Sequence, residues 1–320
     1  MPLVHIQNLH VSFPQHEGLV HAVRGISLAV EAGESVGIVG ESGSGKSVTC
    51  MAALRLLRQP PSRITADGLM LDGVDMLNAS RRDLERIRGK VASMVFQDPM
   101  SAFDPVFTIG HQIVETIRAH TDSSLATANE QAVALLERVR IKTPVSILNS
   151  YPHQLSGGML QRSMIAMALS CRPKILFADE PTTALDVTIQ AQILELIKEL
   201  QAELGMGLVM VTHDLGVVAE TVDRVVVMYG GRVMEEGPVQ AIFDDPRHPY
   251  TRALLNSIPG RTPGKQRLTE IAGQSPNPVN PPTGCPFHPR CTFALPECAS
   301  KVPATRPIGP GRVAACWGLQ

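Results

Sequence analysis

Residues 40–47 of the chain read GESGSGKS and directly follow the apolar run at positions 36–39. This segment fits G-x-x-x-x-G-K-S, the pattern of a phosphate-binding loop between a strand and a helix. Glycines allow successive backbone N–H groups to point at phosphate oxygens, and the positive end of the following helix strengthens the attraction. The spacing predicts that Lys46 reaches the β- and γ-phosphates of ATP and that the Ser47 hydroxyl ligates Mg²⁺. The simpler alternative is a glycine-rich turn before an ordinary helix.

A second pattern is the apolar run at 175–178, which ends in Asp179 and Glu180. A strand that ends in two acids places one carboxylate near Mg²⁺ and the other where it can polarise a water. Many buried strands end this way at a loop, so the pattern alone is weak, but it gains weight because it follows a phosphate loop in the chain. It predicts Asp179 as a magnesium ligand and Glu180 as the residue that activates water.

A third pattern is Ser156-Gly157-Gly158, at the start of an apolar helix. A hydroxyl, two unobstructed N–H groups and the helix dipole together suit an anion, although Ser156 could equally be an ordinary helix N-cap.

In this order, the three motifs resemble those of the ATP-binding cassette (ABC) ATPases, and the resemblance covers residues 1 to about 255. Further family motifs match at single positions, each of which also fits an ordinary structural role. The resemblance implies that Phe13 stacks on adenine and that Gln97 links Mg²⁺ and the attacking water to the transport machinery. It also implies that Asp186 lies in a loop between the two sites of a dimer and that His213 contacts the γ-phosphate.

The resemblance therefore gives a complete set of expected nucleotide contacts. The catalytic residues are Lys46, Gln97, Glu180 and His213, and the magnesium ligands are Ser47, Gln97 and Asp179. The nucleotide-binding residues are Phe13, Gly40, Glu41, Ser42, Gly43, Ser44, Gly45, Lys46, Ser47, Val48, Gln97, Ser156, Gly157, Gly158 and Asp186. Two cassettes of this kind bind ATP head to tail, so Ser156 would face the nucleotide of its partner.

Within the family, the chain is most similar to the ATPase subunits of dipeptide and oligopeptide importers. The matching segments are QDPMSAFDP, SYPHQLSGGMLQR, ADEPTTALDVTIQAQIL and RHPYTRALL, at 97–105, 150–162, 178–194 and 247–255. One departure is Ala102-Phe103, where relatives commonly carry a Ser-Leu-type pair. This region resembles the groove that receives the coupling helix of the membrane subunit.

The pattern of apolar residues predicts strands at 3–11, 24–30, 34–39, 66–71, 91–96, 174–178 and 208–212, and a hairpin at 224–235. It predicts helices at 47–57, 188–204 and 215–220, with a short helix capped by Ser80 and Asp83. Residues 108–149 show only helical spacing. The alternation of strands and helices predicts a layered α/β core with a helical insert. The resemblance implies an α/β ABC ATPase fold: a phosphate-loop core sheet, an antiparallel β subdomain, an inserted helical subdomain at about 98–172 and a small cysteine-containing extension. We place the ATPase domain at 1–256 and the extension at 257–320.

The composition and charge of the chain argue against several classes of function. The net charge of −1 gives no basic field for nucleic acid, and no apolar run approaches the length of a membrane span. The start of the chain lacks the features of a signal peptide, so we expect a cytosolic protein. The runner-up function, a soluble mechanical ABC ATPase of DNA repair or translation, fits less well because there is one cassette and no coiled-coil arm.

Four of the six cysteines lie in the last part of the chain, at Cys285, Cys291, Cys298 and Cys316; Cys50 and Cys171 are expected in the core. The cytosol disfavours disulfides, and four thiolates suit zinc or an iron–sulfur cluster. The spacing lacks the close pairs usual in zinc sites, and tails of this kind in peptide-import ATPases are associated with a four-iron four-sulfur cluster. Reduced thiols in a loosely ordered tail remain the alternative.

The resemblance also implies partners and a location. The expected partners are two transmembrane permease subunits and a second, distinct ABC ATPase, which is favoured over a homodimer. A substrate-binding protein would take part indirectly. The expected location is the cytoplasmic face of the inner membrane. The cargo stays open among dipeptides, oligopeptides, nickel chelates and glutathione-like solutes.

Overall fold

The structure is a computed structural model that describes residues 2–183, 185–258 and 271–319. It divides into two units, which we describe one at a time. The sheet unit comprises Pro2–Val30, Ser35–Asn78 and Val211–Gln320, and the helical unit comprises Glu31–Glu34 and Ala79–Met210. Ala184, within the matched segment 178–194, lies outside the described residues.

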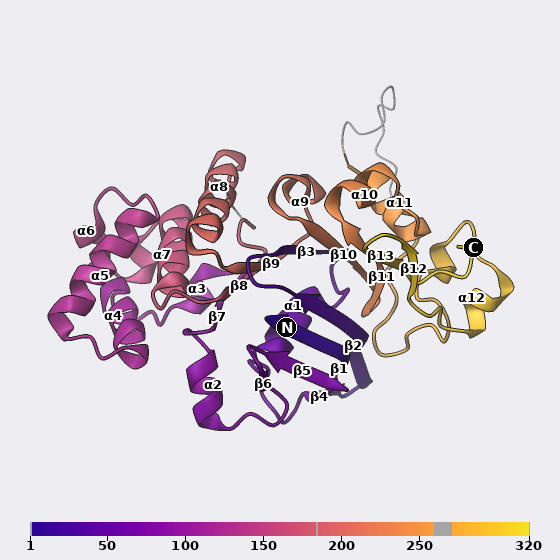
Figure 1. Cartoon of the computed structure of the whole chain (residues 1–320), viewed down its shortest axis with the longest axis horizontal. Coiled ribbons are helices and arrows are strands. Elements are labelled where there is room, and N and C mark those ends of the chain that lie inside the picture. The colour runs from indigo at the N-terminus through magenta and orange to yellow at the C-terminus, as the bar shows by residue number, and fades with distance from the viewer. Residues whose placement is uncertain (1, 184, 259–270, 320) are drawn as a thin grey trace. The chain divides into compact units, whose positions relative to one another are not determined.

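The first sheet of the sheet unit is antiparallel, as expected for the β subdomain (Figure 1). Its strands are β1 (Val4–Gln15), β2 (Gly18–Val30), β4 (Arg63–Thr65), β5 (Gly68–Leu71) and β6 (Val74–Asp75). Their order is β2-β1-β5-β6, with β4 also paired to β1. The predicted strand at 24–30 is the second half of β2, because the hairpin with β1 carries the pairing back to Gly18.

The second sheet of this unit carries the phosphate loop. Its strands are β3 (Ser35–Val39), β10 (Arg224–Tyr229), β11 (Arg232–Pro238), β12 (Arg306–Gly309) and β13 (Arg312–Ala314), in the order β12-β13-β11-β10-β3. β3 is buried along its whole length and runs parallel to β10, as a two-sided core strand should. Helix α9 (Leu215–Thr221) packs on β3, while α10 (Val239–Asp244) and α11 (Pro249–Asn256) pack on β11.

Strands β12 and β13 were not anticipated. No strand or helix was predicted in the C-terminal extension, yet β13 pairs with β11 and so extends the core sheet. Residues 306–314 contain few apolar side chains, so their pattern gave no strand signal. They form strands because the open edge of β11 supplies the backbone hydrogen bonds.

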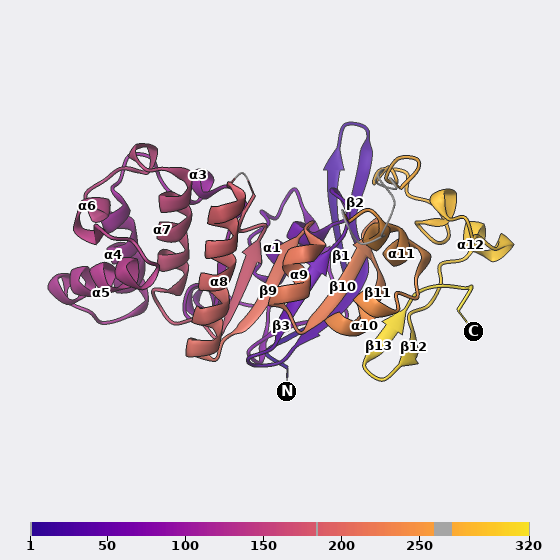
Figure 2. The same ribbon diagram turned by 90° about the horizontal axis from the view of Figure 1, so that it is seen from above.

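The helical unit contains the predicted helices of the region 108–149 (Figure 2). Its helices are α2 (Arg81–Ile87), α3 (Pro99–Ala102), α4 (Ile109–His120), α5 (Leu125–Arg138), α6 (Pro144–Leu148), α7 (Gly157–Leu169) and α8 (Val187–Leu204). Helices α4 to α7 pack against one another. The strands β7 (Ala92–Val95) and β8 (Ile175–Asp179) are parallel, and β9 (Gly207–Thr212) lies next to β8. Within the described ranges, no helix is both long and apolar enough to cross a membrane.

Helix ends follow local signals closely. The predicted cap of α2 is confirmed as a capping box, in which Ser80 and Asp83 bond each other's backbone N–H. Helix α8 begins after the Asp186 cap and ends at Gly205, whose φ of 61° is the left-handed conformation that favours glycine. Helix α1 (Lys46–Ala53) is shorter than predicted, since the backbone turns left-handed at Arg55.

Within the sheet unit, a buried carboxylate on β11 bonds both the C-terminal strand β13 and the backbone just before α11. Glu235 on β11 is 0% exposed and accepts hydrogen bonds from the backbone N–H groups of Arg247 and His248 at 2.9 Å each. The Arg312 guanidinium on β13 pairs with the same carboxylate at 3.0 Å. Three donors surround one buried charge, and Arg312 also contacts Asp245 through the backbone carbonyl oxygen and the carboxylate. Loss of the Glu235 carboxylate therefore leaves the two backbone N–H groups without this acceptor and Arg312 without its buried ionic partner.

We therefore predict that Glu235→Ala lowers the free energy of unfolding by about 3–5 kcal/mol, because it removes the buried acceptor of two backbone N–H groups and leaves Arg312 with only its contacts to Asp245. Chemical denaturation of the purified wild type and variant measures the difference in their free energies of unfolding. The control is Glu85→Ala, which removes an exposed carboxylate paired with Arg81 on α2 and should cost less than about 1 kcal/mol. Equal losses for the two variants would show that the buried network contributes no more than a surface pair.

Candidate nucleotide-binding site

The phosphate loop passes close to neighbouring backbone at two glycines. Gly40 has a φ of +149°, and a Cβ there would lie 2.1 Å from the carbonyl oxygen of Met228. Gly45 has a φ of +96°, and a Cβ there would lie 2.4 Å from the carbonyl oxygen of Ala22. Both contacts are with backbone atoms, which cannot move aside, so only glycine fits at these two positions.

The opposite side of the loop is open. Gly43 has a φ of +76°, and no atom lies within 4 Å of where its Cβ would be. Ser42 and Gly43 are exposed, whereas Lys46 is buried and its Nζ donates to the carbonyl oxygens of Gly40 at 2.9 Å and Glu41 at 3.1 Å. The Ser44 hydroxyl is buried with no hydrogen-bond partner among the described residues.

These features fit the phosphates of ATP. Accessible backbone, a buried ammonium group and an unpartnered hydroxyl are donors that a phosphate group can satisfy. Ser47 and Val48 follow in the first turn of α1, both partly exposed, so the Ser47 hydroxyl stands at the start of the helix as a magnesium ligand requires.

The other predicted residues of the sheet unit lie at strand and helix ends. Phe13 is partly exposed on β1 and pairs with Val20 of β2. His213 is exposed directly after β9, and the next residue, Asp214, caps α9 through bonds to the N–H groups of Gly216 and Val217. A histidine between a strand end and a capped helix has a fixed backbone and an accessible ring.

The helical unit brings Gln97 and Glu180 together. The amide Nε2 of Gln97 donates to Glu180 Oε2 at 3.1 Å, and the Thr183 hydroxyl donates to the same oxygen at 2.8 Å. Glu180 follows the last residue of β8 with a φ of +45°, an uncommon value for a residue other than glycine. Asp179 precedes it and is buried. Two predicted catalytic residues are thus in direct contact, and a strained backbone presents one of them.

The third motif also forms a defined structure. Ser156 caps α7, with its hydroxyl accepting from the N–H of Met159 at 3.4 Å, and both Ser156 and Gly157 are exposed. A Cβ on Gly158 would lie 3.2 Å from a methyl group of Ile189 on α8, so a small residue allows the two helix starts to approach. Asp186 caps α8 by accepting from the N–H of that same Ile189 at 3.0 Å. The signature motif and the Asp186 loop therefore lie side by side.

Near α3, one apolar side chain is buried and three neighbouring apolar side chains are exposed. Phe103, of the unusual Ala102-Phe103 pair, is only 4% exposed. Met100, Val106 and Phe107 flank it and are 45%, 70% and 44% exposed. The exposure of these three side chains was not predicted, because an irregular segment has no periodic pattern that distinguishes buried from exposed residues.

The four C-terminal cysteines are close enough to influence one another. The pKa of the Cys285 thiol is raised to about 11, chiefly by burial and to a lesser extent by the neighbouring Cys298, Cys316 and Cys291. Burial also raises the pKa of Cys291 and of Cys316. All four are free thiols, but in the part of the chain that the structure describes, no group of three or more His, Cys, Asp or Glu residues is arranged to hold a metal. The cysteines as placed do not form the predicted metal site.

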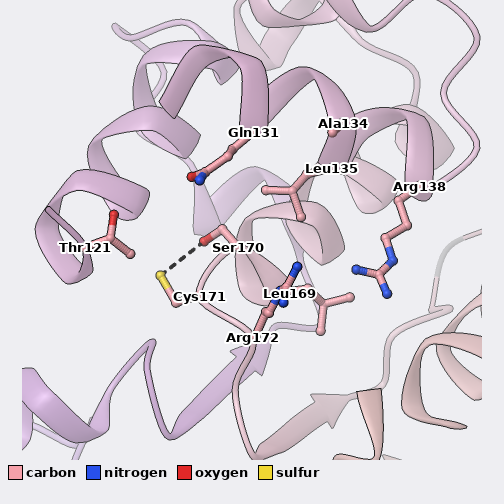
Figure 3. Close-up of a pocket in the computed structure, with 9 residues that line it drawn as sticks. All are labelled: Thr121, Gln131, Ala134, Leu135, Arg138, Leu169, Ser170, Cys171 and Arg172. Carbon is pink, nitrogen blue, oxygen red and sulfur yellow. Dashed lines mark hydrogen bonds between the residues drawn. The ribbon is translucent and has the colours of Figure 1, made fainter. Parts of the chain in front are cut away.

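A pocket of about 310 Å³ lies within the helical unit (Figure 3). Its lining comes from α4, α5, α7 and the residues that follow them: Thr121, Gln131, Ala134, Leu135, Arg138, Leu169, Ser170, Cys171 and Arg172. None of these is a predicted nucleotide-binding residue. Cys171 was expected in the core, but it follows the end of α7 and is only partly buried, with its thiol 3.6 Å from the Ser170 hydroxyl.

Comparison with known proteins agrees with this geometry. The family model "ABC transporter" matches residues 23–183, and the model "Oligopeptide/dipeptide transporter, C-terminal region" matches residues 234–298. The "Probable peptide ABC transporter ATP-binding protein" of Sinorhizobium fredii is 49% identical over 98% of this chain and 94% of its own length. The "Dipeptide transport ATP-binding protein DppD" of Escherichia coli is 47% identical over 99% of this chain and 96% of its own length.

A solved structure shares the fold. The ATP-binding cassette MJ0796, in a dimeric post-hydrolysis state bound to ADP and Pi, gives a TM-score of 0.64 at 28% identity, covering 74% of this chain and 98% of that one. Together with the phosphate loop, the Gln97–Glu180 contact and the capped signature helix, these matches show that the chain belongs to the ABC transporter ATPases and carries the C-terminal region of the oligopeptide and dipeptide transporters.

Proposed function

We propose that this chain hydrolyses ATP to power the import of peptides through separate membrane subunits. The observation that carries this proposal is the near full-length similarity to peptide and dipeptide transport ATP-binding proteins, which includes the C-terminal region of that subfamily. The mechanical ATPase of DNA repair or translation has no support from these relatives.

The residues described above can perform the chemistry in distinct roles. Lys46 offsets charge that develops on the γ-phosphoryl group, and Glu180 orients and polarises the attacking water. Gln97, bonded to Glu180, links that position to the segment carrying Met100, Val106 and Phe107. Mg²⁺, when bound, would neutralise phosphate charge, with Ser47, Asp179 and Gln97 as the residues to hold it. We assign His213 to the γ-phosphate and Phe13 to the adenine ring.

We predict different losses for the two central variants. Lys46→Ala should abolish ATP binding, since it removes the ammonium group held inside the loop. Glu180→Gln should bind ATP normally but slow turnover by about a hundredfold or more, because it removes the group that activates water. Fluorescent-nucleotide titration and steady-state phosphate release separate the two effects, and Glu130→Gln on the exposed face of α5 is the control. Near-normal phosphate release by Glu180→Gln would remove it from the catalytic role.

The proposed assembly contains two membrane subunits and two ATPases at the cytoplasmic face of the inner membrane. Ser156 and the exposed Gly157 at the start of α7 suit the γ-phosphate of a partner's nucleotide in a head-to-tail dimer. The exposed Met100, Val106 and Phe107 offer an apolar surface for a membrane subunit. A substrate-binding protein would deliver the cargo to those membrane subunits.

We expect the second ATPase to be a related but different chain, by analogy with the subfamily. Affinity purification of the tagged chain from native membranes, followed by mass spectrometry, should recover two permease subunits and a distinct ATPase in equal amounts. Recovery of an active complex with two copies of this chain as its only ATPase would contradict the heterodimer. The co-purified subunits also narrow the cargo among dipeptides, oligopeptides, nickel chelates and glutathione-like solutes.

We further propose that the four C-terminal cysteines bind a four-iron four-sulfur cluster, by rearranging from the positions described above. Mutual proximity supports this, because the positive charge of bound iron would stabilise the neighbouring thiolates that burial alone disfavours. The absence of an arranged ligand group among the described residues counts against it.

Anaerobic purification with iron and sulfide analysis tests the cluster. We expect a brown protein whose iron content falls sharply in Cys285→Ser, Cys291→Ser, Cys298→Ser and Cys316→Ser variants. Cys171→Ser, outside this group, should retain its iron. A colourless protein with stoichiometric zinc would show that the cysteines bind zinc and not a cluster. A protein with neither metal would show that they are four reduced thiols.

A further inference from the structure

The phosphate loop is bonded from outside by the C-terminal part of the chain. The Glu41 carboxylate, at the second position of the loop, accepts hydrogen bonds from Arg290 Nη1 at 2.8 Å and from the Ser275 hydroxyl at 2.5 Å. All three residues belong to the sheet unit. The Arg290 side chain is 7% exposed and that of Glu41 is 23% exposed, so water screens this ion pair only weakly.

Arg290 is held in place by several other contacts. Its Nη1 also donates to the Tyr229 hydroxyl at 2.9 Å, and its guanidinium carbon lies 5.7 Å from the centre of that ring. Its Nε and Nη2 donate to the carbonyl oxygens of Ala272 and Ile271 at 2.9 and 2.8 Å. A guanidinium fixed on every side loses little freedom when it binds a carboxylate.

The backbone of Glu41 is fixed as well. Its N–H donates to the Tyr250 hydroxyl at 3.0 Å, and its carbonyl oxygen accepts from Lys46 Nζ at 3.1 Å. Tyr250 is fully buried against Tyr229 and Phe287, with ring centres 4.5 and 5.2 Å away. One loop residue is therefore held by its side chain, its N–H and its carbonyl oxygen at once.

The charge of Glu41 gives this contact a consequence for nucleotide binding. The loop receives the negative phosphates of ATP, and a carboxylate beside it would repel them unless it were neutralised. Ser275, Pro276 and Pro278 also line a cavity of about 210 Å³ together with Glu41, Ser42, Gly43 and Ser44. The C-terminal segment thus forms a wall next to the phosphate loop, and Arg290 forms an ion pair with Glu41 of that loop.

We propose that Arg290 is a positioning residue of the ATP site. By pairing with Glu41 it cancels a negative charge that would otherwise stand beside the phosphates. It acts through Glu41 without touching the nucleotide, so its effect falls on ATP affinity and leaves the chemical step largely unchanged.

The test compares Arg290→Ala with the double variant Glu41→Gln/Arg290→Ala in the full-length chain. Arg290→Ala should weaken the binding of a fluorescent ATP analogue about tenfold, which corresponds to about 1.4 kcal/mol. The KM for ATP should rise with it, while kcat at saturating ATP stays within about twofold. The double variant should recover most of the lost affinity, because no unpaired carboxylate then remains beside the phosphates.

Arg306→Ala is the matched control. Arg306 lies in the same C-terminal segment and donates to the carbonyl oxygen of Cys316 at 2.8 Å, but it has no contact with the loop among the described residues. We expect it to change ATP affinity less than about twofold. A similar loss in this control would show that any disturbance of the C-terminal segment weakens binding, and would overturn the specific role of Arg290.

Two further outcomes would overturn the proposal. One is unchanged ATP affinity in Arg290→Ala; the other is a loss that Glu41→Gln does not restore, which indicates general unfolding of the segment. Should Arg290→Ala not fold, as judged by thermal unfolding, Arg290→Gln takes its place with the same second substitution. Arg290→Lys keeps the charge but not the planar fork of donors, and should retain affinity between those of the wild type and Arg290→Ala.

Discussion

Two backbone carbonyl groups lie in close contact with the phosphate loop, that of Met228 at Gly40 and that of Ala22 at Gly45. This close approach is the constraint on which the rest of the sheet unit depends. It fixes the loop against β10 and β2, so that Lys46 is buried with its ammonium group directed at the loop's own carbonyl oxygens. A loop braced by neighbouring strands keeps its shape without a bound nucleotide, and preorganisation of this kind reduces the cost of binding.

The helical unit solves a different problem, which is to hold two reactive side chains in one place. Glu180 leaves β8 with a left-handed backbone and accepts bonds from Gln97 and Thr183. Gln97 in turn precedes the segment with the exposed Met100 and Phe107. A displacement of that segment by a docked subunit would therefore reach the carboxylate through one hydrogen bond. This is a short physical connection between a protein surface and the residue that we predict to activate water.

Much of the fold and site could be predicted because the relevant signals are local. The glycine spacing of the loop, the apolar runs of β3 and β8 and the cap of α2 depend on neighbours in sequence, and the structure agrees with each. The contact of Arg290 with Glu41 could not be predicted, because the two residues are 249 positions apart and neither has a pattern of its own. The exposure of Val106 and the pairing of β13 with β11 are likewise set by tertiary contacts. The arrangement of the four cysteines is not fixed by their spacing either.

The pairing of β13 with β11 means that the C-terminal segment is part of the main sheet and not an appendage. If the chain were shortened before Arg306, the backbone N–H and C=O groups of β11 that now bond β13 would lose their partners. An uncovered strand edge is a template for adding a strand from another molecule, and it promotes self-association. The C-terminal strands move the free edge of the sheet from β11 to β12, a strand of four residues that contains Pro307 and is therefore a poorer template for an added strand.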